Sequence, residues 1–441
     1  MARILVIYHH HQPRQSITDH LRSFARVGGH DCYFLDTAVW GIPKWASRLP
    51  VDLVIFHTTF LSQRWDPEYF RILLRKSSIF RNARMVKVAI PQDEFAHTDI
   101  LNEFIRECGI SLVFSAAGEA DWKKIYSGTD PGKTGIHRVL TGYMDDNTIG
   151  RIDSLSRKAP VRAVDIGYRA YQAPPWLGRH GYMKLQIAEV FRKEADKRGL
   201  ITDISTELGD TLMGDDWFKF LLKCRYTIGV EGGASILDRD GTVKGRTDRF
   251  MASHPLAGFP EIEAECFPGR DGELSLFALS PRHLEACATG TCQILVEGEY
   301  NGILKSGVHY IELKRDFSNL GRVFDGIELG DSRETIANNA RRDIIDSGEY
   351  SYRKFVDIVV GTALKSAGGS RVPPSGGRDN TTWIPLPALK GGDILSRTLS
   401  QAWRTLTSGG PGKIIKNSLL KPLLLGTRRP PSSGKAPTAE N

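Results

Sequence analysis

The chain has 441 residues, 41% of them hydrophobic and 25% charged, and its formal net charge is +8. These values are ordinary for a soluble globular protein and exclude collagen-like, wholly disordered and disulfide-scaffold classes. Residues 366–441 carry 11 Lys and Arg against three Asp and Glu, so this segment holds the whole excess and residues 1–365 are neutral. The net charge therefore gives no reason to expect nucleic acid as a partner of the main body.

Cysteine usage and the N-terminus indicate a cytoplasmic protein. The six cysteines include no C-x-x-C pair, which favours a reducing compartment over a disulfide framework or a zinc site. The first apolar run, Ile4–Tyr8, is shorter than the roughly 7–15 residues of a secretory signal. We also find no stretch near the roughly 18 apolar residues of a membrane span.

Short apolar runs alternate with helical patterns in the first part of the chain. The runs expected to be strands are Ile4–Tyr8, Cys32–Leu35, Leu53–Phe56, Val86–Ile90, Leu112–Phe114 and Val139–Leu140. The stretches expected to be helices are Ser16–Arg26, Pro67–Arg75, Asp99–Glu107 and Glu119–Tyr126. Apolar runs without strict alternation are typical of parallel strands covered on both faces, which predicts an α/β domain over residues 1–158.

The pattern restarts after Asp146–Pro160, a polar stretch that we expect to be a linker. The later strands are expected at Val161–Ile166, Ile201–Ile204, Tyr226–Val230, Thr291–Leu295 and Tyr310–Leu313. The later helices are expected at Met183–Lys197, Asp216–Cys224, Pro281–Ala288 and from about Asp331 to Leu364. The sequence thus predicts an α/β fold with a second Rossmann-like domain over residues 159–365, facing the first across a cleft. Ligands of such sheets bind at the carboxyl ends of the strands.

Residues 366–441 are rich in Pro, Gly, Ser and basic residues, a composition typical of a flexible tail. Two apolar stretches interrupt it, one around Trp403 and one along Lys413–Leu425. We expect these stretches to contact an anionic membrane surface, with apolar side chains in the interface and basic ones at the headgroups. A solvated, disordered tail and an RNA-binding tail are the two other interpretations.

Three motifs that bind phosphate or metal in other proteins are discounted. The P-loop-like Gly128–Thr134 has Ser127 in place of the first glycine and follows a helix instead of a strand, so we expect an ordinary turn. The loop His9–Pro13 has no glycine, which disfavours an NAD-dependent dehydrogenase. Asp238 and Asp240 form a D-x-D that could hold a divalent cation, but the glycine that follows favours a turn.

The second predicted domain offers candidates for binding a diphosphate. Arg169 ends its first strand, and Gly178, Gly181 and Lys184 lie at the start of a long helix. A helix N-terminus presents free N–H groups and a positive dipole end, to which the two cations would add. A surface arginine and a solvated lysine are the alternative interpretation.

A glycine pair follows another strand of the same domain. Glu231, Gly232 and Gly233 come directly after Tyr226–Val230, and glycines at a strand's carboxyl end allow a ligand to approach the backbone closely. A simple tight turn would explain the pair equally well.

The segment Ser280–Thr291 resembles the two-domain (GT-B) glycosyltransferases. Their pattern Glu-Ala-x-Ala-x-Gly ahead of a strand is matched by Glu285 to Gly290. The resemblance implies that Glu285 contacts the ribose of the sugar donor, since a carboxylate can accept hydrogen bonds from two hydroxyls. Arg282 and His283 in the same segment are included in the expected donor site.

The chain more closely resembles glycosyltransferase-like proteins grouped with spore-maturation factors. In those, a Ser-Pro-Arg-x-x-Glu segment precedes a Tyr-x-Gly-x-Leu loop and a His-Tyr-Ile strand, matched here by Tyr300–Leu304 and Gly307–Tyr310. The resemblance spans roughly residues 160–362. It departs from the family at Phe277, where the family's Glu-x7-Glu pair has its first acid, so Glu285 is the one acid of that pair present.

The acceptor side is expected at Pro91–His97, which follows a buried strand of the first domain. Asp93, Glu94 or His97 could be the general base that takes the proton of an acceptor hydroxyl, although a retaining mechanism needs no such base. His9–His11 and His57 are expected to face the same cleft. A helix cap, for Asp93 in particular, is the alternative for these polar residues.

These features together predict a glycosyltransferase that moves a sugar from a nucleotide-diphosphate sugar to a hydroxyl acceptor in surface glycan or glycoconjugate synthesis. Fixed cations and helix dipoles would stabilise the leaving diphosphate, so we expect no metal and no cofactor. A metal-dependent D-x-D transferase is one alternative. A non-catalytic binding or scaffold protein of the same fold is another, supported by Phe277.

Overall fold

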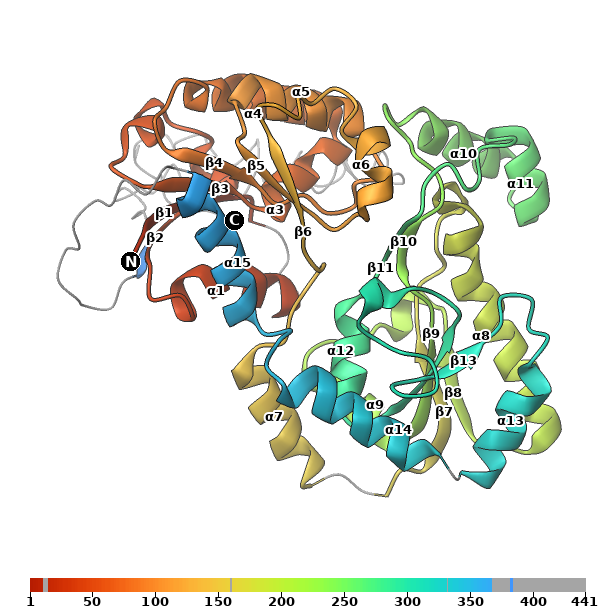
Figure 1. The fold of residues 1–441 in the computed structure, drawn as a ribbon. Coiled ribbons are helices and arrows are strands. Elements are labelled where there is room, and N and C mark those ends of the chain that lie inside the picture. The colour runs from red at the N-terminus through yellow and green to blue at the C-terminus, as the bar shows by residue number, and fades with distance from the viewer. Residues whose placement is uncertain (11–14, 159–160, 331, 367–380, 384–441) are drawn as a thin grey trace, which may run out of the picture. The chain divides into compact units, whose positions relative to one another are not determined.

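In the computed structural model, the apolar runs of the N-terminal part form a parallel sheet (Figure 1). The structure describes residues 1–10, 15–158, 161–330, 332–366 and 381–383. The strands are β1 Arg3–Tyr8, β2 Asp31–Asp36, β3 Leu53–Phe56, β4 Val86–Ala89, β5 Leu112–Ser115, β6 Gly135–Arg138 and β14 Thr381–Trp383. Their order is β14-β2-β1-β3-β4-β5-β6, and every pairing is parallel.

Helices cover both faces of this sheet, so its central strands are fully buried, as the unbroken apolar runs predict. The helices along this part of the chain are α1 Gln15–Arg26, α2 Thr37–Trp40, α3 Thr58–Leu61, α4 Pro67–Ser77, α5 Thr98–Cys108, α6 Glu119–Ile125 and α7 Asp146–Ser156, of which α7 packs against a later helix and not against this sheet. Local sequence sets their ends: Asp66 accepts a hydrogen bond from the Tyr69 amide at the start of α4, and Gly109, with φ of +63°, ends α5.

A second parallel sheet follows in the chain, with the order β13-β12-β9-β7-β8. Its strands are β7 Val164–Arg169, β8 Thr202–Ser205, β9 Cys224–Gly229, β12 Cys292–Val296 and β13 Ile311–Leu313. The helices after β7 are α8 Gly178–Arg198, α9 Asp215–Lys223, α10 Thr242–Ser253, α11 Phe259–Cys266, α12 Pro281–Ala288, α13 Leu320–Leu329, α14 Arg333–Ala340, a π-helical segment Arg341–Asp346 and α15 Tyr352–Ser366. The predicted α/β fold with two Rossmann-like sheets is confirmed.

An antiparallel pair of short strands, β10 Gly232–Ala234 and β11 Leu276–Ala278, brackets α10 and α11. The sequence patterns did not predict this insertion. Gly233 has a φ of +113°, and a Cβ there would overlap the carbonyl oxygen of Leu276. The second glycine of the predicted pair therefore allows β10 to pair closely with β11, and its lack of a side chain is not explained by the approach of a ligand.

Two predicted elements of the first part differ from the structure. Val139–Leu140 is buried but lies beyond β6, whose four residues show no apolar run because β6 is an edge strand with one neighbour. The predicted linker contains α7, which begins where the Asp145 carboxylate accepts hydrogen bonds from the Asn147 and Thr148 amides. A capping side chain, rather than an apolar run, marks this helix.

The end of the chain returns to the first sheet. Helix α15 packs against α1, as Figure 1 shows, and the Tyr352 hydroxyl donates to the Ser16 carbonyl at 3.1 Å. Strand β14 lies within the predicted flexible tail and adds to the edge of the sheet beside β2. The apolar segments of the tail around Trp403 and along 413–425 lie outside the described residues.

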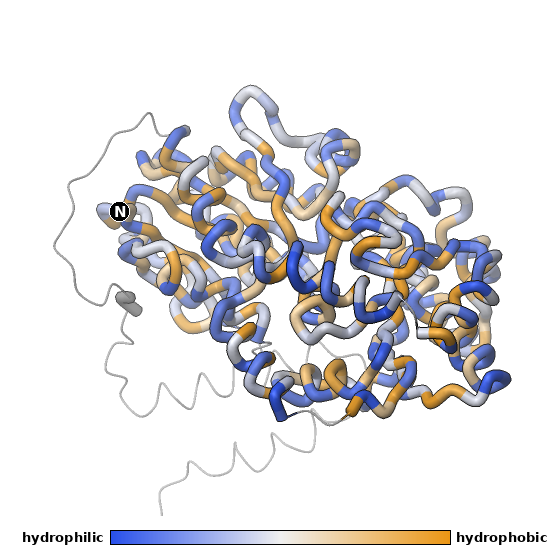
Figure 2. The backbone as a smooth tube through the Cα atoms, turned by 60° about the horizontal axis from the view of Figure 1, so that its bottom comes forward, coloured by the Kyte–Doolittle hydropathy of each residue, from blue (hydrophilic) through white to orange (hydrophobic). Residues whose placement is uncertain are grey.

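Contacts group the described residues, which lie between Met1 and Trp383, into one unit, so the predicted division into domains at residues 158 and 365 remains a prediction. Hydrophobic and hydrophilic residues alternate along much of the chain, as expected where helices bury one face (Figure 2). Among the described residues, no helix combines the length and apolar character that crossing a membrane requires.

Candidate functional site

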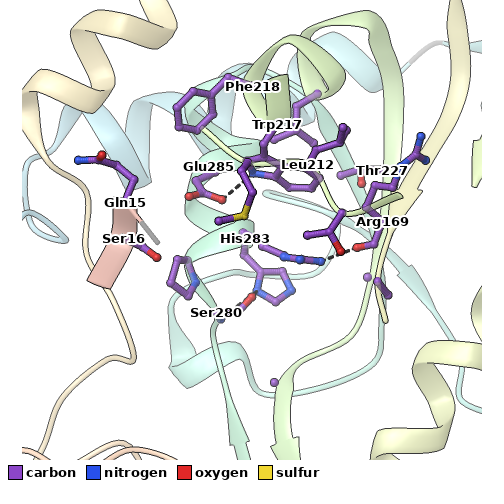
Figure 3. A pocket seen from close by; sticks show the side chains of 18 of the residues that line it. Gln15, Ser16, Arg169, Leu212, Trp217, Phe218, Thr227, Ser280, His283 and Glu285 are labelled. Carbon is purple, nitrogen blue, oxygen red and sulfur yellow. Dashed lines mark hydrogen bonds between the residues drawn. The ribbon is translucent and has the colours of Figure 1, made fainter. Parts of the chain in front are cut away.

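A cavity of about 460 Å³ opens at the carboxyl ends of β7 and β9 and at the start of α12 (Figure 3). Its lining includes seven of the predicted site residues: Asp93, Arg169, Lys184, Gly232, Arg282, His283 and Glu285. Four other predicted residues are not part of the lining: Glu94, His97, Glu231 and Gly233. The structure thus brings together most of the predicted donor residues and one of the three predicted acceptor residues.

Lys184 is an unpaired cation in this cavity. It lies in the second turn of α8 and makes no hydrogen bond or ion pair with any residue that the structure describes. Burial lowers the pKa of Lys184, the nearby Arg282 cation lowers it further, and the Asp93 carboxylate raises it. An ammonium placed in this way is available to an anionic ligand.

The N-terminus of α8 does not form the predicted phosphate site. The Arg179 amide donates to the Asp271 carboxylate at 2.8 Å, and the His180 amide donates to Ser235 Oγ at 3.4 Å. Gly178 has a φ of +79°, and a Cβ there would overlap both Ser235 Oγ and the Asp271 carboxylate. A carboxylate of the chain already lies at the positive end of the helix dipole, so the structure does not support this part of the prediction.

Arg169 is committed to partners within the chain. Its guanidinium pairs with Asp203 at 2.5 Å, donates to the Asp203 carbonyl at 2.8 Å and lies over the Phe220 ring at 4.5 Å. Only 14% of its side chain is exposed, so the predicted contact with phosphate is not supported. Arg282 is the better-placed cation: it is exposed, lines the cavity and donates to the Arg169 carbonyl.

Glu285 lies in the same wall of the cavity, on the second turn of α12. Its Oε2 accepts a hydrogen bond from Trp217 Nε1 at 2.7 Å, and its Oε1 has no partner within the described part of the chain (Figure 3). Burial raises the pKa of Glu285, against the opposing effects of the Trp217 bond and of Arg282. Sequence reasoning missed Trp217, because an aromatic residue on an amphipathic helix carries no signal of its own.

His283 presents one ring nitrogen as a donor. The Ser280 amide donates to His283 Nδ1 at 3.0 Å, which completes a capping box at the start of α12. Burial lowers the pKa of His283 to about 4, so the ring is neutral at pH 7 and its proton sits on Nε2. This N–H has no partner among the described residues and can serve an anionic ligand.

Asp93 is the one predicted acceptor-side residue that lines the cavity. It has a φ of +54°, an uncommon conformation for a residue other than glycine, and its carboxylate makes no hydrogen bond within the described residues. The Asp93 side chain is accessible to solvent, but many protein atoms lie around its carboxylate. The resulting desolvation raises the pKa of Asp93, whereas the charges of Arg64 and Lys184 lower it. The alternative of a helix cap is not supported, because His97 holds the cap position of α5.

The strained backbone around Asp93 is held by a buried arginine. Arg64 is 0% exposed, and within the described part of the chain its guanidinium donates only to main-chain carbonyls. The four acceptors and their distances are Leu61 at 3.0 Å, Gln92 at 2.6 Å, Asp93 at 2.7 Å and Ala96 at 3.2 Å. Asp93 is thereby fixed in the wall of the cavity by its own carbonyl.

The other two predicted acceptor residues point elsewhere. Glu94 is fully buried and accepts hydrogen bonds from the Ser115 and Tyr126 hydroxyls and from the Ala116 amide. His97 is 6% exposed, and its ring packs edge-on against Trp65. Neither placement supports the predicted role as general base.

Glu231, His57 and His9 also make hydrogen bonds within the protein and do not face the cavity. Glu231 is 1% exposed and accepts a hydrogen bond from the Tyr300 amide at 2.7 Å, which fixes the loop after β12. His57 is buried and bonded to His20 at 2.9 Å, and His9 is buried against Thr37. None of the three lines the cavity, and residue 11 lies outside the described residues.

The D-x-D motif caps a helix. Asp238 is 3% exposed and accepts hydrogen bonds from the Gly241, Val243 and Lys244 amides, and Asp240 accepts one from the Thr242 amide. Among the described residues, no group of three His, Cys, Asp or Glu side chains is arranged to hold a metal ion. The motif therefore fits the turn interpretation.

Asp238→Ala should lower stability and leave nucleotide binding unchanged. Losing the cap of α10 costs about 1–2 kcal/mol, measurable as a lower midpoint of thermal unfolding. The exposed Asp248→Ala on the same helix is the control and should leave the midpoint nearly unchanged. Loss of nucleotide binding in Asp238→Ala, or on adding EDTA, would instead support the metal-dependent alternative.

Comparisons with known proteins give weak matches in structure alone. No model of a protein family matches the chain, and no curated protein matches it in sequence. The Anabaena HepE complex with UDP-glucose aligns with 83% of this chain and 100% of its own, at 12% identity and a TM-score of 0.46. An alpha-glucosyltransferase in complex with UDP and a 13-mer DNA aligns with 82% of this chain and 99% of its own, at 11% identity and a TM-score of 0.47.

Sucrose-phosphate synthase from Thermosynechococcus elongatus aligns with 84% of this chain and 100% of its own, at 9% identity and a TM-score of 0.46. Similarities of this size transfer neither a substrate nor a mechanism.

Proposed function

We propose that the chain is a glycosyltransferase of the GT-B type, which moves a sugar from a nucleotide-diphosphate sugar to a hydroxyl acceptor. The observation that carries the proposal is the composition of one cavity, in which Lys184, Arg282 and Glu285 lie together with Asp93. Two cations, a carboxylate with a free oxygen and a second, unpaired carboxylate match the parts of such a reaction.

The donor would bind along the wall formed by α8 and α12. The Lys184 ammonium and the Arg282 guanidinium would face the diphosphate, and His283 Nε2–H would add a neutral donor. These groups stabilise the negative charge that develops as the diphosphate leaves, so the reaction would need no metal. Glu285 would accept a hydrogen bond from the ribose of the donor, as its resemblance to the GT-B pattern implies.

The acceptor would bind beside Asp93. As the acceptor oxygen bonds to the anomeric carbon, the bond from that carbon to the diphosphate breaks, and the hydroxyl proton passes to the Asp93 carboxylate. The surrounding protein atoms raise the pKa of Asp93 by desolvation, which makes its carboxylate a stronger base than that of an aspartate in bulk water. A reaction that retains the anomeric configuration would use Asp93 to position the acceptor instead.

The setting of the reaction is part of the proposal. The likeness to spore-maturation-type proteins over residues 160–362 and the basic composition of residues 366–441 support a role in surface glycan synthesis at the cytoplasmic face of a membrane. The membrane contact rests on composition alone, because most of the tail lies outside the described residues.

Glu285→Ala should weaken the binding of nucleoside diphosphates about tenfold or more, the size of one hydrogen bond to a charged group. We would titrate the full chain by calorimetry with UDP, GDP and CDP, and then test the matching UDP-, GDP- and CDP-sugars for hydrolysis. Glu189→Ala, an exposed residue of α8, is the control. If no member of the panel binds, or if Glu285→Ala binds as well as the unaltered chain, the proposal is wrong.

A non-catalytic binding protein is the second candidate, favoured by one observation. Phe277 stands where the family has an acid, and its ring stacks on His180 at 3.8 Å between centroids. No carboxylate can therefore act from that position. Tight binding of a nucleotide sugar without turnover of the sugar would support this second function.

A further inference from the structure

We propose that a surface formed by α4 and by the 3-10 helix η1 Lys44–Arg48 binds the anionic headgroups of a phospholipid bilayer. This contact is separate from the one proposed for residues 366–441, and it goes beyond the proposed transfer reaction. The surface, which we call the basic face, consists of six exposed residues: Lys44, Trp45, Arg48, Ile72, Arg75 and Lys76.

The basic face lies where the positive charge of the body is concentrated. Residues 41–51 and 69–86 together contain seven Lys and Arg and no Asp or Glu. Because residues 1–365 sum to zero, the rest of this body carries the compensating net charge of −7. The charge of the neutral body is therefore unevenly distributed, with its excess of cations in two short segments.

Most of these seven cations have no partner in the protein. Arg71 and Arg81 pair with Glu103 and Glu107 of α5. The side chains of the other five make no hydrogen bond or ion pair with any residue that the structure describes: Lys44, Arg48, Arg75, Lys76 and Arg84. Unpaired cations are available to an anionic partner.

The acids that flank the basic face along the chain do not neutralise it. Asp36 accepts a hydrogen bond from the Ala38 amide at the start of α2, and Asp66 accepts one from the Tyr69 amide at the start of α4. Glu68 is exposed in the first turn of α4, two turns before Arg75. One unpaired acid therefore stands beside five unpaired cations.

Contacts place α4 and η1 side by side. Lys76 Nζ lies 3.4 Å from the point where a Cβ on Gly41 would stand, and η1 begins three residues after this glycine. In addition, η1 packs against the 3-10 helix η3 Ser78–Phe80, which directly follows α4. Ile72 lies four residues before Lys76 and shares its face of α4.

Two large apolar side chains are exposed among these cations. Trp45 is 41% exposed and Ile72 is 42% exposed. A bilayer interface suits this combination, because apolar side chains enter the boundary between headgroups and acyl chains while Lys and Arg meet the headgroup phosphates. The basic face thus offers both kinds of contact that peripheral binding uses.

Charge decides among the possible occupants of this surface. Residues 384–441 carry nine Lys and Arg against two Asp and Glu, so the end of the chain is itself repelled, and a second copy of the basic face would be repelled in the same way. A nucleic acid matches the charge but offers the Ile72 side chain no apolar layer to enter. An anionic bilayer matches both properties.

We would test this by co-sedimentation of the full chain with vesicles of phosphatidylcholine alone and with vesicles containing about one third phosphatidylglycerol. The unaltered chain should pellet with the anionic vesicles, and less so as salt is added. Replacing Arg48, Arg75 and Lys76 together by Gln should raise the lipid concentration that pellets half of the protein about 100-fold, since each charge contributes about fivefold. UDP binding by calorimetry should stay unchanged in this variant.

The matched control removes three exposed, unpaired lysines elsewhere in the body: Lys123→Gln, Lys193→Gln and Lys305→Gln. It should change vesicle binding by less than about fivefold. If the first triple variant unfolds, Trp45→Ser in the full chain replaces it and should weaken vesicle binding several-fold.

Three results would overturn the proposal. The first is no preference of the unaltered chain for anionic vesicles. The second is equal pelleting of the basic-face variant and the unaltered chain, which would assign the contact to residues 366–441. The third is loss of binding to a single-stranded RNA oligonucleotide, measured by fluorescence anisotropy, with vesicle binding intact. Failure of every nucleoside diphosphate to bind would refute the proposed function and leave these results as they are.

Discussion

Arg64→Met should destabilise the protein by about 3 kcal/mol or more, a larger effect than we expect from any surface substitution. Methionine fills much of the same volume but donates no hydrogen bonds. The substitution leaves four carbonyls without their donor. The bonds to Leu61 and Ala96 are buried, and each buried group left unsatisfied costs about 1–3 kcal/mol. Removing a buried cation recovers part of this loss, because the desolvation of the guanidinium is no longer required.

The effect should concentrate in the loop that carries Asp93. Asp93 and His97 both have positive φ values, of +54° and +52°, which cost on the order of 1 kcal/mol each in residues other than glycine. Arg64 bonds to carbonyls along this loop and so offsets that strain. Without it, we expect the loop to relax and Asp93 to leave the wall of the cavity.

The midpoint of thermal unfolding should fall by roughly 5 °C or more in Arg64→Met, and hydrogen exchange should speed up in residues 91–97. Arg71→Met is the control, because Arg71 is 56% exposed and pairs with Glu103 on the surface, where such pairs contribute about 0–1 kcal/mol. Equal midpoints for the two variants would show that the carbonyl contacts of Arg64 do not hold the loop.

The strands and the candidate donor segment could be predicted from sequence because each depends on local pattern. Buried parallel strands give unbroken apolar runs, and Leu53–Phe56 and Pro281–Ala288 match the structure residue for residue. Edge strand β6 and helix α7 were missed because partial exposure and a capping side chain replace the apolar signal.

Only part of the site could be predicted, because the direction of a side chain depends on contacts between segments that are distant in sequence. Asp93 and Glu94 are neighbours in sequence, yet one lines the cavity and the other bonds to Ser115 and Tyr126. Likewise, Arg169 was expected to face a phosphate and pairs with Asp203, which no spacing in the sequence indicates. A residue type at a strand end predicts that a group is near the ligand, but not which way it points.

Lys184→Met should weaken the binding of a nucleoside diphosphate about 10- to 100-fold, the size of one charged hydrogen bond. In the unaltered chain the affinity should also depend on alkaline pH. The diphosphate binds the charged ammonium, and burial together with Arg282 lowers the pKa of Lys184. Affinity should therefore be full below this lowered pKa and fall as the pH rises through it, before the ordinary lysine value of about 10.4 is reached.

Lys184→Arg separates the charge from the rest of the side chain, because a guanidinium stays protonated throughout this pH range. Calorimetry with the tightest-binding diphosphate from pH 7.5 upward should give a dissociation constant that rises in the unaltered chain and stays flat in Lys184→Arg. Lys193→Met, on an exposed position of the same helix, should follow the unaltered chain. If Lys184→Met binds as tightly as Lys193→Met at pH 7.5, the diphosphate does not contact Lys184, and the cavity would have to bind its anion through Arg282 and His283 alone.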